Sequence, residues 1–248
     1  MNKFLLLSLL FTSYLGAQTI TVAVAANVSY AMEKLKKEFL KTHKDTKLRI
    51  IIGGSGKLTA QIKHGAPYDI FLSANMKYPN SLYKDKVAIT KPVVYAQGSL
   101  AFLSKSKKDF SKGIELLTDS SIRLIAVANP KTAPYGKAAI EAIKNYGIYD
   151  DIKKKFIYGE SISQTLSYTV SAADIGIVSK SALFSCKMEK FKKGINWVEV
   201  DSKLYTPIEQ GIVILKHAKD NNGVREFYNF MLSDDAKKIL THYGYIVR

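Results

Sequence analysis

Short β-branched runs alternate with amphipathic segments along this chain, and this alternation limits the folds that it can adopt. Residues 20–26 (ITVAVAA), 48–52 and 68–74 are predicted strands, and apolar residues recur at helical spacing after the first two. A strand followed by a helix, repeated, predicts parallel strands joined by right-handed crossovers, with helices on both faces of the sheet. We therefore expect an α/β protein.

The same alternation begins again in the second half of the chain, with predicted strands at 123–128, 155–158 and 175–178. Two extended stretches, 93–103 and 208–215, lie on either side of this second unit. Two α/β units joined by two extended connectors predict a chain that crosses from one lobe to a second lobe and then returns.

The N-terminus has the pattern of a secretory signal peptide. Lys3 precedes an apolar run at 4–11, and small residues lead to Ala17. The run is shorter than the roughly 20 residues of a membrane-spanning helix, so we expect cleavage after Ala17 and a periplasmic mature protein. The expected division of the chain is a signal peptide at 1–17, lobe I at 18–97 and 208–248, and lobe II at 98–207.

The chain has one cysteine, Cys186, so it forms no intramolecular disulfide. This cysteine does not follow the signal segment, so it is not placed for the lipid attachment of bacterial lipoproteins. We expect Cys186 to be a small buried residue, and not a nucleophile or a ligand.

The formal net charge of +16 comes mainly from lysines that are spread through the chain. Lysines at helical spacing are typical of solvated helix faces. No arginine-rich arm, recognition motif or basic–aromatic repeat accompanies them, which argues against nucleic acid as a partner. A positive field would instead raise the encounter rate with an anion, most strongly at low salt.

Small, hydroxyl-bearing and glycine-flanked residues recur where predicted strands end and helices begin. In open α/β sheets, ligands bind at this edge. Helix N-termini offer free N–H groups and a partial positive charge there, which suits an anion. Each residue alone is an ordinary helix cap, so the cluster carries the argument. Its members are Asn27, 54–56 (GSG), 133–136 (APYG), 160–162 (ESI) and Ser179.

Several catalytic chemistries find no support in the sequence. The segment 52–58 (IGGSGKL) lacks the outer glycine and the Ser or Thr of a nucleotide-binding phosphate loop. The four histidines show no metal-binding spacing, and no G-x-S-x-G elbow is present. Asp69 and Glu160 are the carboxylates nearest to the cluster, and both have sufficient structural explanations. We therefore expect no enzymatic activity.

Four segments, 25–32 (AANVSYAM), 65–74 (GAPYDIFLSA), 176–178 (GIV) and 243–245 (YGY), resemble bacterial molybdate-binding proteins of ABC importers. The resemblance implies a type II periplasmic binding protein fold, with two lobes, two connecting strands and closure over the ligand. It also implies molybdate or tungstate as the ligand, held through its oxygens by uncharged donors, with no cofactor and no direct protein–metal ligand. A monomer that delivers the anion to a membrane permease is the expected form.

The resemblance also assigns the site residues. It places donors on the side-chain amide of Asn27, where many relatives have serine, on the hydroxyl of Ser55, and on the backbone of Tyr135 and Ile162. Some relatives have a tyrosine where this chain has Ser179, whose side chain is shorter. Two alternatives follow: the site loses one donor, or the hydroxyl of Tyr135 replaces it. Lys57 is considered as a direct charge partner, but a solvated side chain fits it better. We place molybdate binding at Asn27, Ser55, Tyr135, Ile162 and Ser179.

Two alternatives stay open at this point. The same fold could bind sulfate, phosphate or an iron chelate, although iron capture would require converging Tyr, His and carboxylate ligands. An exported hydrolase acting on a phosphate ester would need a nucleophile and a base, which the predicted cleft does not offer. The sequence does not separate molybdate from tungstate, because the two ions are nearly equal in size.

Overall fold

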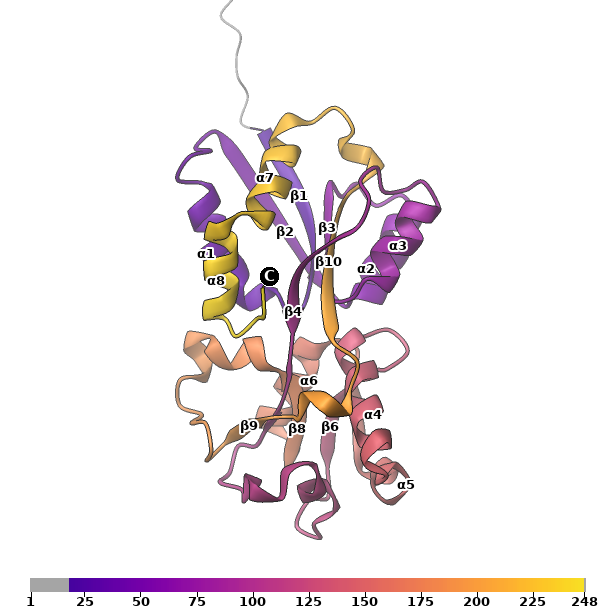
Figure 1. The fold of residues 1–248 in the computed structure, drawn as a ribbon, viewed down its shortest axis with the longest axis vertical. Coiled ribbons are helices and arrows are strands. Elements are labelled where there is room, and N and C mark those ends of the chain that lie inside the picture. Colours follow the sequence, from indigo (N-terminus) through magenta and orange to yellow (C-terminus); the bar gives the residue numbers. More distant parts are fainter. Residues whose placement is uncertain (1–17, 248) are drawn as a thin grey trace, which may run out of the picture.

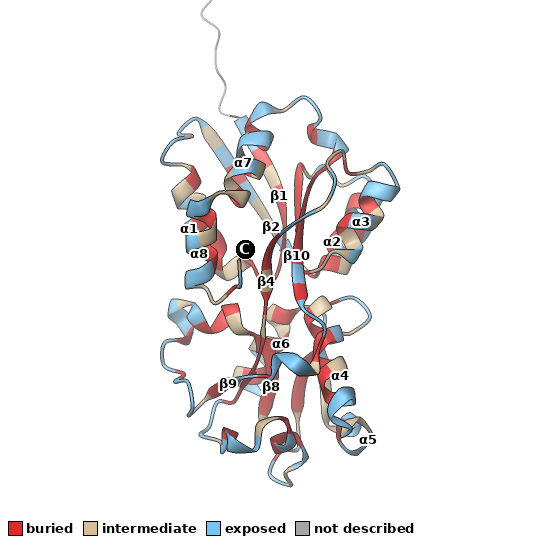
Figure 2. Ribbon diagram, in the orientation of Figure 1, coloured by how far each residue is buried: buried red, intermediate tan, exposed pale blue. Residues whose placement is uncertain are grey.

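The computed structural model describes residues 18–247, so the predicted signal peptide at 1–17 lies outside the described residues. Two five-stranded sheets form two lobes that are stacked along the long axis of the molecule (Figure 1). The central strands of both sheets are largely buried, the edge strand β2 is mostly exposed or intermediate, and the helices expose their outer faces (Figure 2). Within the described residues, no helix is long and apolar enough to span a membrane. The expected α/β class is confirmed.

The sheet of lobe I has the strand order β2-β1-β3-β10-β4. β1 is parallel to β2 and β3, whereas β10 is antiparallel to β3 and β4. The strands are β1 (Gln18–Ala25), β2 (Thr46–Gly53), β3 (Ile70–Ser73), β4 (Val93–Gly98) and β10 (Ile208–Ile214). The helices are α1 (Ser29–Phe39), α2 (Ser55–Lys63), α3 (Lys77–Lys84), α7 (Asn222–Leu232) and α8 (Asp234–His242).

Helices cover both faces of this sheet, as the near-continuous apolar sequence of β1 requires. Ile20, Val22 and Val24 pack against α1, α7 and α8, whereas Ala23 faces the cluster of α2 and α3. Successive side chains of a strand point to opposite faces. The strand is therefore buried on both sides, and its C-terminal end is the part that reaches the interlobe region.

The sheet of lobe II has the order β7-β6-β8-β5-β9. β6 is parallel to β7 and β8, and β5 is antiparallel to β8 and β9. The strands are β5 (Leu100–Leu103), β6 (Ile125–Ala128), β7 (Phe156–Gly159), β8 (Ile175–Ser179) and β9 (Trp197–Glu199). The helices are α4 (Pro134–Tyr146), α5 (Tyr149–Ile152) and α6 (Ile162–Ser171). The 3₁₀ segments of this lobe are η1 (Phe110–Thr118), η2 (Lys153–Lys155), η3 (Lys180–Phe184), η4 (Cys186–Met188) and η5 (Ser202–Leu204), whereas η6 (Lys216–Ala218) packs in lobe I.

The crossings between lobes explain where the sheets depart from the expected parallel arrangement. The extended stretch predicted at 93–103 is divided at Ser99 into β4 of lobe I and β5 of lobe II. β10 returns the chain to lobe I. Because β5 and β10 each enter a lobe from its interlobe end, they run opposite to strands whose C-terminal ends face that region.

The expectation of a buried Cys186 is wrong, because this residue is exposed. Cys186 begins the short turn η4, and Met188 at the end of that turn is the residue that packs into the core. A one-turn 3₁₀ element has only one inward-facing position, and the larger apolar side chain occupies it.

Candidate anion-binding site

A small, partly open pocket lies between the two lobes. Its walls come from segments far apart in the sequence, at the C-terminal ends of strands and at the starts of helices. The lining residues are Ala25, Ala26, Asn27, Gly54, Ser55, Ala74, Ala133, Pro134, Tyr135 and Ile162.

Four of the five predicted site residues line this pocket. Asn27 follows β1, Ser55 is the first residue of α2, Tyr135 is the second residue of α4, and Ile162 is the first residue of α6. The parallel strands of both sheets end toward the interlobe region, so the helix starts that follow them converge there. The topology of the two lobes therefore brings these residues together.

The backbone N–H groups of these four residues point to the chemistry of the pocket. No hydrogen-bond acceptor is found for the N–H of Asn27, Ser55, Tyr135 or Ile162 within residues 18–247. The first N–H groups of a helix have no partner inside the helix. They also lie at the positive end of the helix dipole. Buried N–H groups require an acceptor, so the pocket wall is suited to an anion.

The hydroxyl of Ser55 is a fifth donor. Its Oγ accepts a hydrogen bond of 3.0 Å from the backbone N–H of Ala74, and Ser55 is buried. That bond fixes the oxygen and leaves the hydroxyl hydrogen available for a ligand. Ala74 also lines the pocket, although the sequence did not identify it as a site residue. Its position at the end of the segment 65–74 was the available signal.

The side-chain amide of Asn27, which we expected to donate to the anion, is instead hydrogen-bonded within the protein, which leaves the backbone N–H as the donor group of Asn27 without a partner in the described residues. Its Nδ2 donates to Oε1 of Gln210 at 2.7 Å and to the hydroxyl of Tyr245 at 2.8 Å. An amide group has two hydrogens, and these two short bonds use both. The hydroxyl of Tyr135 lies 3.3 Å from the same nitrogen. Helix α1 begins without a side-chain cap.

The structure does not bring Ser179 to the pocket. This residue ends β8 opposite Leu100 and is fully buried, and its Oγ has no hydrogen-bond partner within the described residues. Lys57 is exposed and does not line the pocket either. The solvated interpretation of Lys57 therefore fits the structure better than a direct role.

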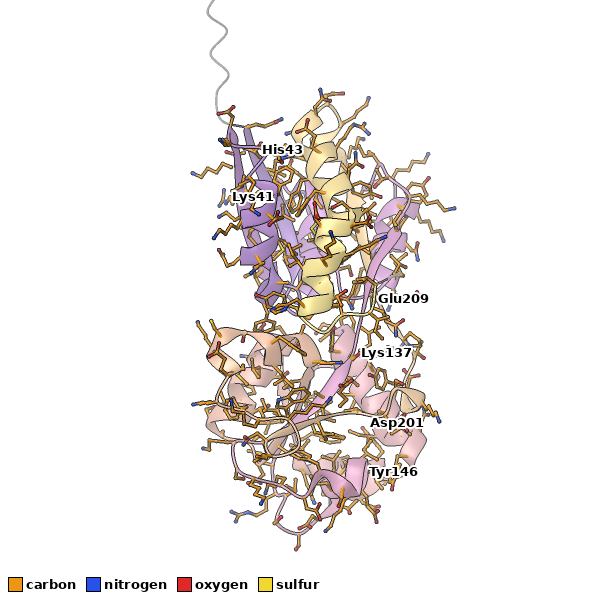
Figure 3. All side chains as sticks on the ribbon, turned by 60° about the vertical axis from the view of Figure 1, so that its left-hand side comes forward. Lys41, His43, Lys137, Tyr146, Asp201 and Glu209 are labelled. Carbon is orange, nitrogen blue, oxygen red and sulfur yellow. The ribbon has the colours of Figure 1, made fainter. Side chains whose placement is uncertain are left out.

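No charged side chain lines the pocket within the part of the chain that the structure describes. The labelled charged residues Lys41, Lys137 and Asp201 lie instead on the outer surface (Figure 3). Burial raises the pKa of the Tyr135 and Tyr245 hydroxyls above their ordinary value, so both phenols stay neutral near pH 7. The pocket therefore offers dipoles and hydrogen bonds without a formal charge.

The lobes are in direct contact around the pocket. The hydroxyl of Ser163, in α6 of lobe II, lies 3.3 Å from the carbonyl oxygen of Ala26 in lobe I. A Cβ on Gly54 would approach the carbonyl oxygen of Glu160 in the opposite lobe to 3.2 Å. The absence of a side chain at Gly54 allows the two backbones to approach closely. The described conformation is therefore a closed one.

Two lobes, two connecting segments and an uncharged donor pocket at their interface define a solute-binding protein of the periplasmic type. Comparison with known proteins agrees, because the model of the bacterial extracellular solute-binding protein family matches residues 20–246. The chain belongs to this family.

Individual relatives narrow the comparison. The molybdate-binding protein ModA of Azotobacter vinelandii is 32% identical over 233 residues, covering 92% of this chain and 90% of the relative. ModA of Rhodobacter capsulatus is 31% identical over 234 residues, covering 93% and 89%. The solved structure of the Azotobacter vinelandii periplasmic molybdate-binding protein has a TM-score of 0.85 at 28% identity, covering 92% and 99% of the two chains. The expected periplasmic binding protein fold is confirmed.

Proposed function

We propose that this protein captures molybdate between its lobes and delivers it to an ABC importer. The observation that carries the proposal is the convergence of four unpartnered backbone N–H groups and the Ser55 hydroxyl on one uncharged pocket. The similarity to proteins named for molybdate binding supports the identity of the anion.

Uncharged donors can bind a dianion tightly. Taking a dianion out of water costs its hydration, so each of its oxygens must be hydrogen-bonded in the pocket. Hydrogen bonds to a charged group contribute roughly 1.5–3 kcal/mol each. Three helix N-termini, those of α2, α4 and α6, add their dipoles to the same site. Together these contributions account for tight binding without a lysine or an arginine.

A fixed cradle of donors selects the anion by size and by protonation. Sulfate is smaller than molybdate, so donors spaced for the longer metal–oxygen bond would be left unpaired around it, which a buried site penalises. Phosphate brings a proton at neutral pH, and the donor groups that line the pocket cannot accept it. Tungstate is nearly equal to molybdate in size, and we expect it to bind as well.

The protein acts as a carrier and not as an enzyme in this proposal. Among the lining residues, Ser55 is the one whose hydroxyl could be considered as a nucleophile. Its Oγ accepts a hydrogen bond from the N–H of Ala74 and does not contact a base. The other lining residues carry no carboxylate, imidazole or thiol. We further propose that the mature chain works in the periplasm as a monomer, after removal of residues 1–17, and hands its cargo to a membrane permease.

Titration calorimetry on the mature chain tests the proposal with molybdate, tungstate, sulfate and phosphate in turn. We expect one tetrahedral dianion per chain, tight binding of molybdate and tungstate, and much weaker binding of the other two. A thermal-shift series should follow the same order, because a ligand that binds only the folded state raises the midpoint. Equal affinity for sulfate and molybdate would disprove selection by size.

A further inference from the structure

The C-terminal tail ends at the junction between the lobes. After α8 the chain turns at Gly244, whose φ of 74° lies in the left-handed region that favours glycine. Ile246 then pairs with Gln97 of β4 through two backbone hydrogen bonds of 2.7 and 2.9 Å. This pairing fixes Tyr245, which is only 3% exposed, against a strand that connects the two lobes.

The hydroxyl of Tyr245 joins three segments of the fold. It accepts a hydrogen bond from Nδ2 of Asn27 at 2.8 Å, and its own hydrogen lies within reach of the Asn27 carbonyl oxygen at 2.9 Å and of Ser181 Oγ at 3.2 Å. Ser181 belongs to η3 of lobe II, and its hydroxyl donates to the same carbonyl at 3.0 Å. One phenol therefore contacts lobe I and lobe II at the same point.

These contacts hold Asn27 at both of its polar ends. The side-chain Nδ2 of Asn27 donates to Gln210 and Tyr245, and the backbone carbonyl oxygen of Asn27 accepts from Tyr245 and Ser181. Among residues 18–247 neither the backbone N–H nor the buried Oδ1 of Asn27 has a hydrogen-bond partner, and of these two groups only the N–H can donate to an anion. A residue held in this way cannot turn its N–H out of the pocket.

The geometry points to Tyr245 as a positioning residue that couples closure of the lobes to the anion donor at Asn27. Because Ser181 belongs to lobe II and Asn27 to lobe I, opening of the lobes would separate these two residues, and the hydrogen-bonded network is complete in the described closed conformation. The Tyr245 hydroxyl therefore stabilises the closed state more than the open one. The effect on binding rests on the proposed function, whereas the effect on closure does not.

The ligand-binding test compares Tyr245→Phe with Tyr95→Phe. Tyr95 is a matched control, because it is also buried but its hydroxyl has no hydrogen-bond partner among residues 18–247. We expect the dissociation constant for molybdate to rise about 10-fold or more in Tyr245→Phe, since a buried network loses a partner, and to change less than about twofold in Tyr95→Phe. Stopped-flow measurements should show that faster release accounts for most of the change.

Ser181→Ala provides a second variant with a small structural change. It should weaken molybdate binding in the same direction. The double variant Tyr245→Phe/Ser181→Ala should lose less affinity than the product of the two single losses, because the two side chains share one network. Independent, fully multiplicative losses would contradict a shared role.

A ligand-free measurement separates this inference from the proposed function. Spin labels at Lys84→Cys in lobe I and Lys107→Cys in lobe II, in a Cys186→Ser background, report the distance between the lobes. Tyr245→Phe should shift the distance distribution toward the open form, whereas Tyr95→Phe should not. If wild type fails to bind any tetrahedral oxyanion, the proposed function fails and this measurement alone decides the inference. An unchanged distance distribution in Tyr245→Phe overturns the inference. Where binding is measurable, a Tyr245→Phe variant with the affinity and release rate of the wild type overturns it as well.

Discussion

The backbone N–H of Gly56 donates a hydrogen bond of 3.1 Å to the carbonyl oxygen of Thr132. Gly56 lies in the first turn of α2 in lobe I, and Thr132 lies in lobe II just before α4, so this bond joins the two lobes in the described conformation. The hydroxyl of Tyr78 donates to the same oxygen at 3.2 Å. The rim of the pocket is therefore closed by neutral hydrogen bonds, as its interior is lined by neutral donors.

Gly56→Ala should weaken molybdate binding without harming the open protein. The new Cβ would lie 2.8 Å from the Thr132 carbonyl oxygen and 2.9 Å from the Tyr78 hydroxyl, which is too close for a stable contact. Overpacking costs typically 1–3 kcal/mol, so we expect the dissociation constant to rise by about 10-fold or more. Calorimetry measures the affinity, and thermal unfolding without ligand should show a midpoint no lower than wild type, because alanine favours the helix.

Lys57→Ala is the matched control for that variant. Lys57 is the next residue along α2, but its side chain is exposed and does not line the pocket. We expect wild-type affinity from this variant. A loss of affinity as large as that of Gly56→Ala would show that the lysine charge acts on the anion, against an uncharged site.

Ser55→Ala removes the side-chain hydroxyl that we propose as a donor to the anion. Loss of a buried hydrogen bond to a charged acceptor should cost roughly 1–3 kcal/mol of binding free energy for both molybdate and tungstate. Ser179→Ala is the control, since Ser179 is buried without a partner and away from the pocket. Its affinity should stay at the wild-type value. If Ser179→Ala weakened binding and Ser55→Ala did not, the assignment of the hydroxyl donor would be reversed.

Sequence periodicity predicted most of the fold because the strands and helices near the site obey local rules. The helices observed to begin at Ser55, Pro134 and Ile162 start within the segments 54–56, 133–136 and 160–162, where helix starts were predicted. Convergence of such starts at one edge of a sheet is a general property of α/β topology. The residues that follow strands were therefore the part of the site that could be predicted.

The rest of the site depends on tertiary contacts that no local pattern encodes. Gln210 and Tyr245 reach Asn27 across 183 and 218 residues of sequence, and Ser181 reaches it from the other lobe. Ser179 was placed at the site by its position after Gly-Ile-Val, but the pairing of β8 with β5 sets it opposite Leu100. The position of Ser179 depends on the register between β5 and β8, which are far apart in the sequence. A single sequence does not reveal this register.

Asp69→Ala should destabilise the protein without changing its affinity. Asp69 is buried, and its carboxylate accepts hydrogen bonds from the backbone N–H of Thr21 at 2.7 Å and from Nδ1 of His217 at 2.8 Å. Truncation would leave the Thr21 N–H unpaired, which costs roughly 1–3 kcal/mol, whereas the exposed His217 ring would be hydrated. Urea unfolding should detect this loss, while Glu160→Ala, at an exposed position, should stay within about 0.5 kcal/mol of wild type. A change in molybdate affinity for Asp69→Ala would argue for a functional role of this carboxylate.

Alkaline pH should destabilise the protein through its buried phenols. Burial raises the pKa of Tyr95 and Tyr135 well above the ordinary value of 10.0, so the folded state keeps their protons at a pH where the unfolded state releases them. The unfolded state then binds fewer protons, and the free energy of unfolding falls as the pH rises above about 10. Each such phenol contributes up to ~1.4 kcal/mol per pH unit in that window, and none below it. Urea unfolding between pH 8 and pH 11 should therefore show a smaller decline for Tyr95→Phe than for wild type, because that variant removes one of these groups without removing a hydrogen bond. Identical declines in the two proteins would mean that Tyr95 is not protonated preferentially in the folded state.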